Sequence, residues 1–285
     1  MDFLQPTTWA DALAAKAEHP DAVPISGGTD LMVGLNFGQT PPPALIDLTA
    51  IPELRDWTRD DGTIRLGAGV SYTRIIDELG AQLPALAQAS RTVGSPQIRN
   101  RATVAGNLGT ASPAGDAHPP LLATGAVVEA ESVRGSREIA IDDFYLGVKR
   151  NALAPDELIR AIRVPAAVGP QHFAKVGSRN AMVIAVCTVA VAVDPEERRV
   201  GTGLGSAAPT PRRSPDAETF AAASLPWSGG ALDPDVAREF GQRLAAAASP
   251  IDDVRGAAAY RSHALAVLAR RALTWAWSEL QEGRS

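Results

Sequence analysis

Residues 8–17 have the polar and apolar pattern of an amphipathic helix. Trp9, Leu13 and Ala17 repeat every four residues, and Thr8 stands in front of them as a helix cap. Similar repeats and short apolar runs predict the other elements of the first half of the chain. The helices are expected at residues 71–79 and 83–89, and the strands at residues 23–26 and 44–48.

Apolar and other residues alternate over residues 157–164, and a different pattern follows them in the second half of the chain. Residues 164–170 contain two prolines and a glycine, which predicts a linker. Beyond it, short apolar runs predict three strands, at residues 173–177, 181–193 and 199–207. Because only the short turn at residues 194–197 separates the last two strands, they are expected to form an antiparallel hairpin.

The remainder of the chain is mostly helical in pattern, and its last helix has one apolar stripe. The residues expected on the buried face of that helix are Leu265, Leu268, Ala272 and Trp275, spaced 3, 4 and 3. Arg261, Arg270 and Glu279 are expected to remain in contact with water.

The length of 285 residues predicts two domains, because a typical domain contains roughly 100–200 residues. The linker places the boundary between residues 1–166 and 167–285. The mixture of helices with short strands, two of which are expected to form an antiparallel hairpin, predicts the α+β class.

A formal net charge of −5 argues against nucleic acid or an anionic membrane surface as a partner, since both require a basic face. Cys187 is the only cysteine, so this chain cannot form an internal disulfide or hold an iron–sulfur cluster by its own thiolates. The first residues lack the apolar core of a secretory signal, and the apolar run at 181–193 is too short to span a bilayer. These features predict a cytoplasmic protein.

Two glycine-containing segments are candidates for ligand binding. In Gly27-Gly28-Thr29-Asp30, the glycines follow a predicted strand and allow backbone amides to turn toward an anion, with Thr29 as a further donor. The alternative for this segment is an ordinary turn between a strand and a helix, capped by Thr29 or Asp30.

Residues 94–120 are rich in Gly, Ser, Thr, Asn, Asp and Pro and have no sustained period, so a long functional loop is expected. Its portion from Thr103 to Asp116 alternates glycines with hydroxyl and amide side chains that can bind one extended, phosphate-bearing ligand. The alternative is a surface loop made of turn-forming residues.

Other chemistries are disfavoured. Neither glycine-rich segment has the lysine of a Walker-type loop, and Gly203 to Ala208, a formal dinucleotide fingerprint, is followed by Pro209 where a helix should begin. The histidines have no metal-ligand spacing, and Cys187 lies in an apolar strand where a thiolate is costly. Lys175 is expected either to face a cleft between the domains, where it stabilises a reduced anionic cofactor, or to be a solvated lysine at a strand edge.

The two loops together resemble those of the FAD-binding medium subunits of molybdenum hydroxylases, the family of xanthine dehydrogenase and carbon monoxide dehydrogenase. The resemblance extends over nearly the whole chain. The matching segments are residues 25–31, 93–107, 111–116, 119–122, 157–159 with 164–165, 175–179, and 259–261 with 268–273.

The resemblance implies a two-lobed PCMH-type FAD-binding domain, with lobes of about residues 1–56 and 57–166, followed by a smaller domain with a three-stranded antiparallel sheet and a helical bundle. It implies that FAD lies between the two loops. The FAD-binding residues that it implies are Pro24, Ile25, Ser26, Gly27, Gly28, Thr29, Asp30, Leu31, Ala102, Thr103, Gly106, Asn107, Thr110, Ser112, Gly115, Asp116, Ile159 and Lys175.

Within this set, Ile159 and Lys175 are expected toward the adenine or isoalloxazine ends of the cofactor. Asp116 is an anion and would repel a phosphate, so it is expected to bind ribityl or ribose hydroxyls or to hold the loop. No metal ligand and no acid–base catalytic residue is expected in this chain.

The same resemblance implies partner chains: a small subunit with 2Fe-2S clusters and a large molybdopterin subunit, in a dimer of heterotrimers. Electrons would pass from the clusters through FAD to NAD or another acceptor. Carbon monoxide dehydrogenase medium subunits have a Gly-Gly-His-Ser pattern in the first loop and Gly-Gly-Asp in the second, where this chain has Gly27-Gly28-Thr29-Asp30 and Ala105-Gly106-Asn107. An N-heterocycle, an aldehyde or a related compound is therefore the expected substrate class.

Two alternatives remain at this point. One is a stand-alone FAD-dependent oxidoreductase that binds its own substrate over the flavin. The other is a flavin-binding interaction module without redox function.

Overall fold

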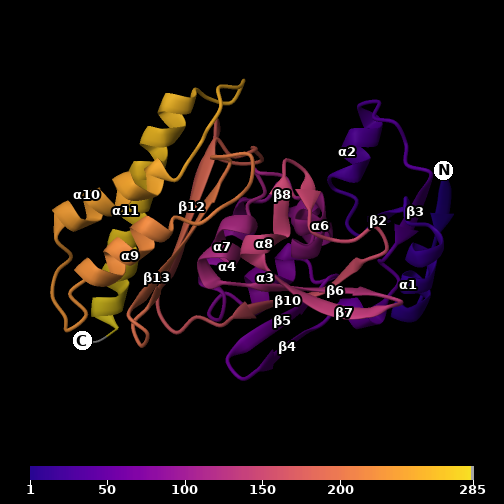
Figure 1. Ribbon diagram of the computed structural model, residues 1–285, viewed down its shortest axis with the longest axis horizontal. Coiled ribbons are helices and arrows are strands. Elements are labelled where there is room, and N and C mark those ends of the chain that lie inside the picture. Colours follow the sequence, from indigo (N-terminus) through magenta and orange to yellow (C-terminus); the bar gives the residue numbers. More distant parts are fainter. Residues whose placement is uncertain (284–285) are drawn as a thin grey trace.

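The computed structural model describes residues 1–283 and arranges its elements in three groups along the long axis of the molecule (Figure 1). The N-terminal group lies at one end, a larger central group follows, and the C-terminal helices form the other end. The predicted α+β class is confirmed.

The N-terminal group is a small parallel sheet with helices beside it. Its elements are β1 (Asp2–Leu4), α1 (Trp9–Glu18), β2 (Val23–Ile25), α2 (Leu31–Asn36) and β3 (Ala44–Asp47), followed by a short 3-10 helix, Pro52–Leu54. The strand order is β1-β3-β2, and β3 pairs parallel with both neighbours. The side chain of Thr8 accepts a hydrogen bond from the Asp11 nitrogen, so the predicted cap of α1 is confirmed. The loop between β2 and α2 faces the central group.

The central group is a five-stranded antiparallel sheet with helices packed over it (Figure 1). The strands are β4 (Trp57–Asp60), β5 (Thr63–Gly67), β6 (Val127–Ser132), β7 (Gly135–Ala140) and β10 (Leu158–Pro165). Their order is β4-β5-β10-β6-β7, which puts the apolar β10 in the middle.

The remaining central elements connect these strands. They are α3 (Tyr72–Glu78), α4 (Pro84–Thr92), α5 (Pro96–Arg101), α6 (Val104–Thr110), α7 (His118–Thr124), α8 (Ile141–Phe144) and the two-stranded β8 (Tyr145–Gly147) and β9 (Arg150–Asn151). α3 and α4 agree with the predicted helices, and the Ser71 hydroxyl caps α3.

The prediction of one long loop over residues 94–120 is wrong, because α5, α6 and the start of α7 lie inside it. α5 and α6 contain six and seven residues, too few for an apolar period to be recognised in the sequence. Ser95 and Thr103 cap them by accepting hydrogen bonds from the nitrogens of Ile98 and Gly106. Helix caps and packing therefore stabilise α5 and α6 in a segment whose composition alone indicated turns.

The C-terminal group is a three-stranded antiparallel sheet, order β11-β12-β13, with a helical layer on its outer face. Its elements are β11 (Gln171–Val176), β12 (Cys187–Asp194), β13 (Arg199–Gly205), α9 (Pro215–Ser224), α10 (Pro234–Ala246) and α11 (Ala258–Glu282). The predicted β12–β13 hairpin is confirmed. The strand expected over 181–193 begins only at Cys187, so residues 181–186 were assigned wrongly.

The glycines of β13 explain the formal dinucleotide fingerprint in this segment. Alternate residues of a strand face opposite sides, and a Cβ at Gly203 would overlap the Pro119 carbonyl and lie 2.7 Å from its carbon. A Cβ at Gly201 would similarly meet Ala123. The glycines therefore allow α7 to pack directly on the inner face of the sheet. This contact joins the C-terminal group to the central one.

The C-terminal helix corrects two predictions. Trp275 is 47% exposed, whereas Trp277 is 1% exposed and donates a hydrogen bond from Nε1 to the Gly230 carbonyl oxygen at 2.9 Å. Arg261, expected in water, is buried and donates to the Ser206 carbonyl at 3.0 Å as well as to the Asp253 carboxylate. The buried face of the helix passes from Leu273 to Trp277, four residues later. The predicted stripe instead passed from Ala272 to Trp275, three residues later, and so selected the wrong tryptophan.

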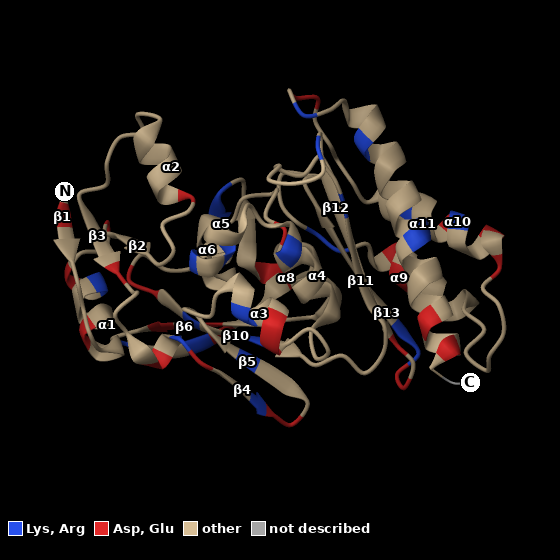
Figure 2. Ribbon diagram, turned by 180° about the vertical axis from the view of Figure 1, so that it is seen from behind, with Lys and Arg blue, Asp and Glu red and all other residues tan. Residues whose placement is uncertain are grey.

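Basic residues, all of them arginines, and acidic residues both occur along the strands of the central sheet (Figure 2). Two ion pairs between strands are Arg65–Glu129 at 2.6 Å and Arg163–Glu138 at 2.5 Å. Within residues 1–283, no helix combines the length and the hydropathy that a membrane span requires.

The two tryptophans provide a test of the packing of α11. We expect Trp277→Ala to lower the free energy of unfolding by about 3–5 kcal/mol, because it empties a buried site between α11 and Trp227. Trp275→Ala, on the same helix, should cost less than about 1 kcal/mol. Urea denaturation followed by far-UV circular dichroism measures both, and equal losses would contradict the assignment of the buried face.

Candidate functional site

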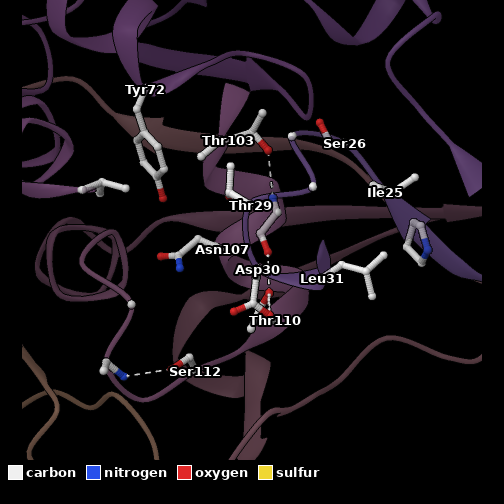
Figure 3. Close-up of a pocket in the computed structure, with 18 of the residues that line it drawn as sticks. Ile25, Ser26, Thr29, Asp30, Leu31, Tyr72, Thr103, Asn107, Thr110 and Ser112 are labelled. Carbon is white, nitrogen blue, oxygen red and sulfur yellow. Dashed lines mark hydrogen bonds between the residues drawn. The ribbon is translucent and has the colours of Figure 1, made fainter. Parts of the chain in front are cut away.

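A cleft lies between the β2–α2 loop of the N-terminal group and helix α6 of the central group. It consists of two adjoining cavities of about 270 and 480 Å³. The smaller cavity is shown in Figure 3. Both cavities are lined by Pro24, Ser26, Asp30, Leu31, Gly106 and Thr110. The cleft is therefore a continuous, elongated space rather than two separate sites.

The structure brings together most of the residues selected from the sequence. All of them except Asp116, Ile159 and Lys175 line the smaller cavity. Ile159 lines the larger one. Asp116 and Lys175 line neither cavity and instead contact each other, at 2.6 Å.

The first glycine of the β2–α2 loop permits a backbone-to-backbone contact between the two walls of the cleft. A Cβ at Gly27 would overlap the Arg101 carbonyl oxygen and lie 2.9 Å from the Ala102 nitrogen. Gly28 has a φ of +70°, a conformation that other residues rarely adopt. The two glycines thus have different roles, one in close approach and one in the turn.

This loop presents free backbone donors to the cleft. Within the part of the chain that the structure describes, the amides of residues 27–31 have no hydrogen-bond acceptor. Asp30 precedes α2, but its side chain forms no cap hydrogen bond. The segment does connect a strand to a helix, as the alternative has it, but neither Thr29 nor Asp30 caps that helix with its side chain. Unpaired amides next to a hydroxyl make a site for an anion.

The opposite wall is α6 and the turn after it. Thr103 caps α6 at its start, and Asn107 Oδ1 accepts a hydrogen bond from the Ala117 nitrogen at 3.4 Å. A Cβ at Gly115 would lie 2.7 Å from Asn107 Oδ1 and 2.6 Å from a ring carbon of His118, so only glycine fits there without movement. Thr110 lies 3.5 Å from the Asp30 carboxylate across the cleft. The wall therefore presents amide and hydroxyl groups at fixed positions.

Four lining residues of the smaller cavity were not selected from the sequence: Tyr72, Val93, Ala114 and Ile184. Tyr72 begins α3, and its backbone nitrogen donates to the Ala102 carbonyl at 3.0 Å. A single aromatic residue at a helix start gives no sequence signal for a ligand site. Ile184 comes from the C-terminal group, so all three groups contribute to the cleft.

Asp116 and Lys175 form a buried ion pair behind the cleft. Their side chains are 7% and 9% exposed, and Asp116 Oδ2 also accepts a hydrogen bond from Thr92 at 3.1 Å. Burial raises the pKa of Asp116 above its ordinary value, while Lys175 and Thr92 act in the opposite direction. Lys175 is therefore not a solvated lysine. The contacts of Asp116 fit the expected role of holding the loop, and its role toward sugar hydroxyls stays a prediction.

Two other titratable groups are chemically quiet. Burial lowers the pKa of His118 to about 3, so its ring is neutral near pH 7, and Tyr145 Oη lies 2.9 Å from its Nδ1. Burial also raises the pKa of the Cys187 thiol to about 12, which disfavours a nucleophilic thiolate. The described residues contain no group of three or more His, Cys, Asp or Glu arranged to hold a metal ion.

The cleft is suited to bind one long ligand that carries both anionic and hydroxyl groups. The amides of residues 27–31 with Thr29 suit a phosphate, whereas the Asp30 carboxylate suits a hydroxyl donor. The larger cavity adds the apolar side chains of Leu158 and Ile159. These features together match an extended dinucleotide better than a small substrate.

Known proteins resemble this chain over nearly its whole length. Residues 1–167 match the family described as the FAD binding domain in molybdopterin dehydrogenase, and residues 172–276 match the CO dehydrogenase flavoprotein C-terminal domain. The nicotinate dehydrogenase FAD-subunit of Eubacterium barkeri is 34% identical over 210 residues, covering 70% of this chain and 71% of that protein.

Two further proteins are also similar to this chain over most of its length. The xanthine dehydrogenase FAD-binding subunit of Escherichia coli O157:H7 is 34% identical over 231 residues, covering 77% of this chain and 78% of the relative. A solved chain of carbon monoxide dehydrogenase from Hydrogenophaga pseudoflava superposes with a TM-score of 0.88 at 28% identity and covers 98% of both chains.

The buried ion pair gives a prediction with a defined pH dependence. We expect Lys175→Met to lower the free energy of unfolding at pH 8 by about 3 kcal/mol, because it leaves the Asp116 carboxylate buried without a cation. A carboxyl whose pKa is higher in the folded than in the unfolded state stabilises the fold as it takes up a proton, so the deficit should shrink as the pH falls. Urea denaturation between pH 8 and pH 5 measures this.

The double variant Asp116→Asn/Lys175→Met is the control. It has no charge at either position of the pair, so it should recover most of the lost stability and lose the additional pH dependence of the single variant. A single variant whose deficit is independent of pH would contradict the assignment.

Proposed function

Since this chain belongs to the family of FAD-binding domains in molybdopterin dehydrogenases, we propose that it is the FAD-carrying subunit of a heteromeric molybdenum hydroxylase. The observation that carries the proposal is the cleft itself. Two loops about 75 residues apart in the sequence form its opposite walls, with unpaired amides on one and fixed amide and hydroxyl groups on the other. FAD lies along this cleft.

The residues present fit the cofactor. The amides of residues 27–31 and the hydroxyl of Thr29 hold the pyrophosphate, and Asn107 with Ser112 supplies polar groups opposite them. Asp30 accepts hydrogen bonds from hydroxyls of the cofactor, and Ile159 packs against one of its rings. The flavin accepts electrons one at a time and delivers two to an acceptor. The chain binds and orients it.

The other redox centres lie on partner chains. Cys187 is buried in β12 and is the only cysteine, so a 2Fe-2S cluster ligated by thiolates needs a different subunit. We propose a small subunit with 2Fe-2S clusters and a large molybdopterin subunit, in a dimer of heterotrimers, with NAD or another acceptor for the electrons. The named relatives are FAD subunits of a nicotinate dehydrogenase and a xanthine dehydrogenase, which supports an N-heterocycle as substrate of the assembly.

The boundary between the two domains belongs to this proposal. One buried cluster extends from Trp9 to Val164 and a second from Cys187 to Leu280, and few elements separate them. This division supports a domain boundary between residues 166 and 167. We propose a cytoplasmic location for the assembly, in keeping with the lone cysteine.

The assembled complex tests the electron-transfer role. We expect the complex purified with its partners to contain flavin, iron and molybdenum, and its flavin to be reduced by substrate only while the partner subunits are present. Absorbance at 450 nm follows the reduction. Reduction of the isolated chain by substrate would instead indicate a stand-alone oxidoreductase. A flavin that the intact complex cannot reduce would indicate a redox-inactive module.

Gly27 tests the location of FAD. We expect Gly27→Ala to weaken FAD binding by about 100-fold, equivalent to about 2.7 kcal/mol, because the added methyl group pushes the amide loop away from Arg101. Fluorescence titration of the flavin-free chain gives the affinity. Gly80→Ala is the matched control, since a Cβ there meets only the Ile76 carbonyl at 3.5 Å. Equal affinities for the two variants would contradict this location.

A further inference from the structure

Tyr72 lines the smaller cavity, and its buried hydroxyl has no hydrogen-bond partner in the described part of the chain. The side chain is 2% exposed. In Figure 3, its ring enters from α3 and its oxygen points toward the space beside Asn107. Neither the sequence motifs nor the comparisons assign a role to this residue.

A buried hydroxyl of this kind needs an explanation. Most buried side-chain polar atoms in proteins have a hydrogen-bond partner, and a buried tyrosine hydroxyl usually finds one. A buried donor that is left unpaired is costly. Since no acceptor for Tyr72 comes from the described residues, an acceptor in the cavity itself accounts for its position.

The hydroxyl is also held in place. The Tyr72 nitrogen donates to the Ala102 carbonyl at 3.0 Å, and Ser71 forms a β-bridge with Thr103. Ala102 belongs to the turn against which Gly27 packs, so the start of α3 and both walls of the cleft meet at this point. The ring belongs to the main buried cluster. Tyr72 therefore presents a donor of fixed position to the same ligand that the two loops enclose.

The protonation state of Tyr72 suits a donor. Burial raises the pKa of its hydroxyl far above the ordinary value, and the negative charge of Asp116 acts in the same direction. The O–H bond therefore remains intact at every physiological pH.

We propose that Tyr72 is a cofactor-positioning residue, whose hydroxyl donates a hydrogen bond to an oxygen or nitrogen acceptor of the FAD bound in the cleft. The inference rests on the proposed function, because the acceptor belongs to the cofactor. It adds a third contact, from α3, to those made by the two loops.

Tyr145 provides the matched comparison. It is a buried tyrosine of the same cluster, but its hydroxyl lies 2.9 Å from His118 Nδ1, so it has a partner within the chain. Removal of the hydroxyl oxygen from each residue is therefore expected to affect two different quantities, FAD affinity for Tyr72 and protein stability for Tyr145. Tyr72→Phe removes an interaction with the ligand, whereas Tyr145→Phe removes an interaction within the protein.

The test uses the full chain stripped of flavin, with FAD as the probe. We expect Tyr72→Phe to bind FAD about 10-fold more weakly than wild type, by fluorescence titration, while the melting temperature of the flavin-free protein stays the same or rises. The increase in melting temperature on addition of FAD should be smaller than in wild type. Tyr145→Phe should lower the melting temperature of the flavin-free protein and change FAD affinity less than 3-fold.

The outcomes separate this inference from the function on which it rests. If wild type binds FAD and Tyr72→Phe binds it with the same affinity, the role of Tyr72 is overturned and the proposed function stays intact. A fall in the melting temperature of flavin-free Tyr72→Phe without a loss of affinity would assign the hydroxyl to a partner within the protein, and would also overturn it. Absence of FAD binding by the wild-type chain and by its purified complex would overturn the proposed function itself.

Discussion

The cleft depends on one backbone contact, the packing of Gly27 against the peptide that joins Arg101 to Ala102. This contact brings the loop after β2 to within reach of α6, although nearly 75 residues separate them in the sequence. It requires the absence of a side chain at Gly27 and a positive φ at Gly28. The loop is thereby held in the wall of the cleft with its amides unpaired. Because these amides form no hydrogen bonds within the protein, a bound ligand that accepts hydrogen bonds from them would stabilise the loop.

The C-terminal group supports the same site from the other side. Glycines of β13 allow α7 to pack on the sheet, which brings Lys175 to Asp116 and the Ser206 nitrogen to the Pro113 carbonyl, at 2.6 and 2.7 Å. Both contacts hold the turn between α6 and α7. Ile184 then reaches the cavity. The C-terminal group thus takes part in shaping the cleft, in addition to covering the central group.

The sequence predicted the elements whose signals are local. Repeats behind Thr8 and Ser71, the hairpin turn after Asp194, and the two polar, glycine-rich segments all correspond to features of the structure. The short helices α5 and α6 were missed because six or seven residues contain less than two turns, and their stability comes from caps and packing. Trp275 and Arg261 were assigned to the wrong environments because partners distant in sequence decide which residues of a long helix are buried.

The same distinction holds for the site. The two glycine-rich segments could be selected because their composition is unusual, the family resemblance implied the individual residues within them, and most of those residues line one cavity. Tyr72 could not be selected, because an aromatic residue at the start of a helix is ordinary and only its unpaired hydroxyl distinguishes it. Asp116 and Lys175 were both selected, yet their contact with each other follows from the docking of the C-terminal sheet and has no local signal.

Hydrogen–deuterium exchange of the full chain, with and without FAD, tests whether the unpaired amides bind the cofactor. We expect the amides of residues 27–31 to exchange freely without FAD and to become protected when FAD binds, together with residues 103–116. Protection that develops elsewhere, while the amides of residues 27–31 exchange at an unchanged rate, would contradict it.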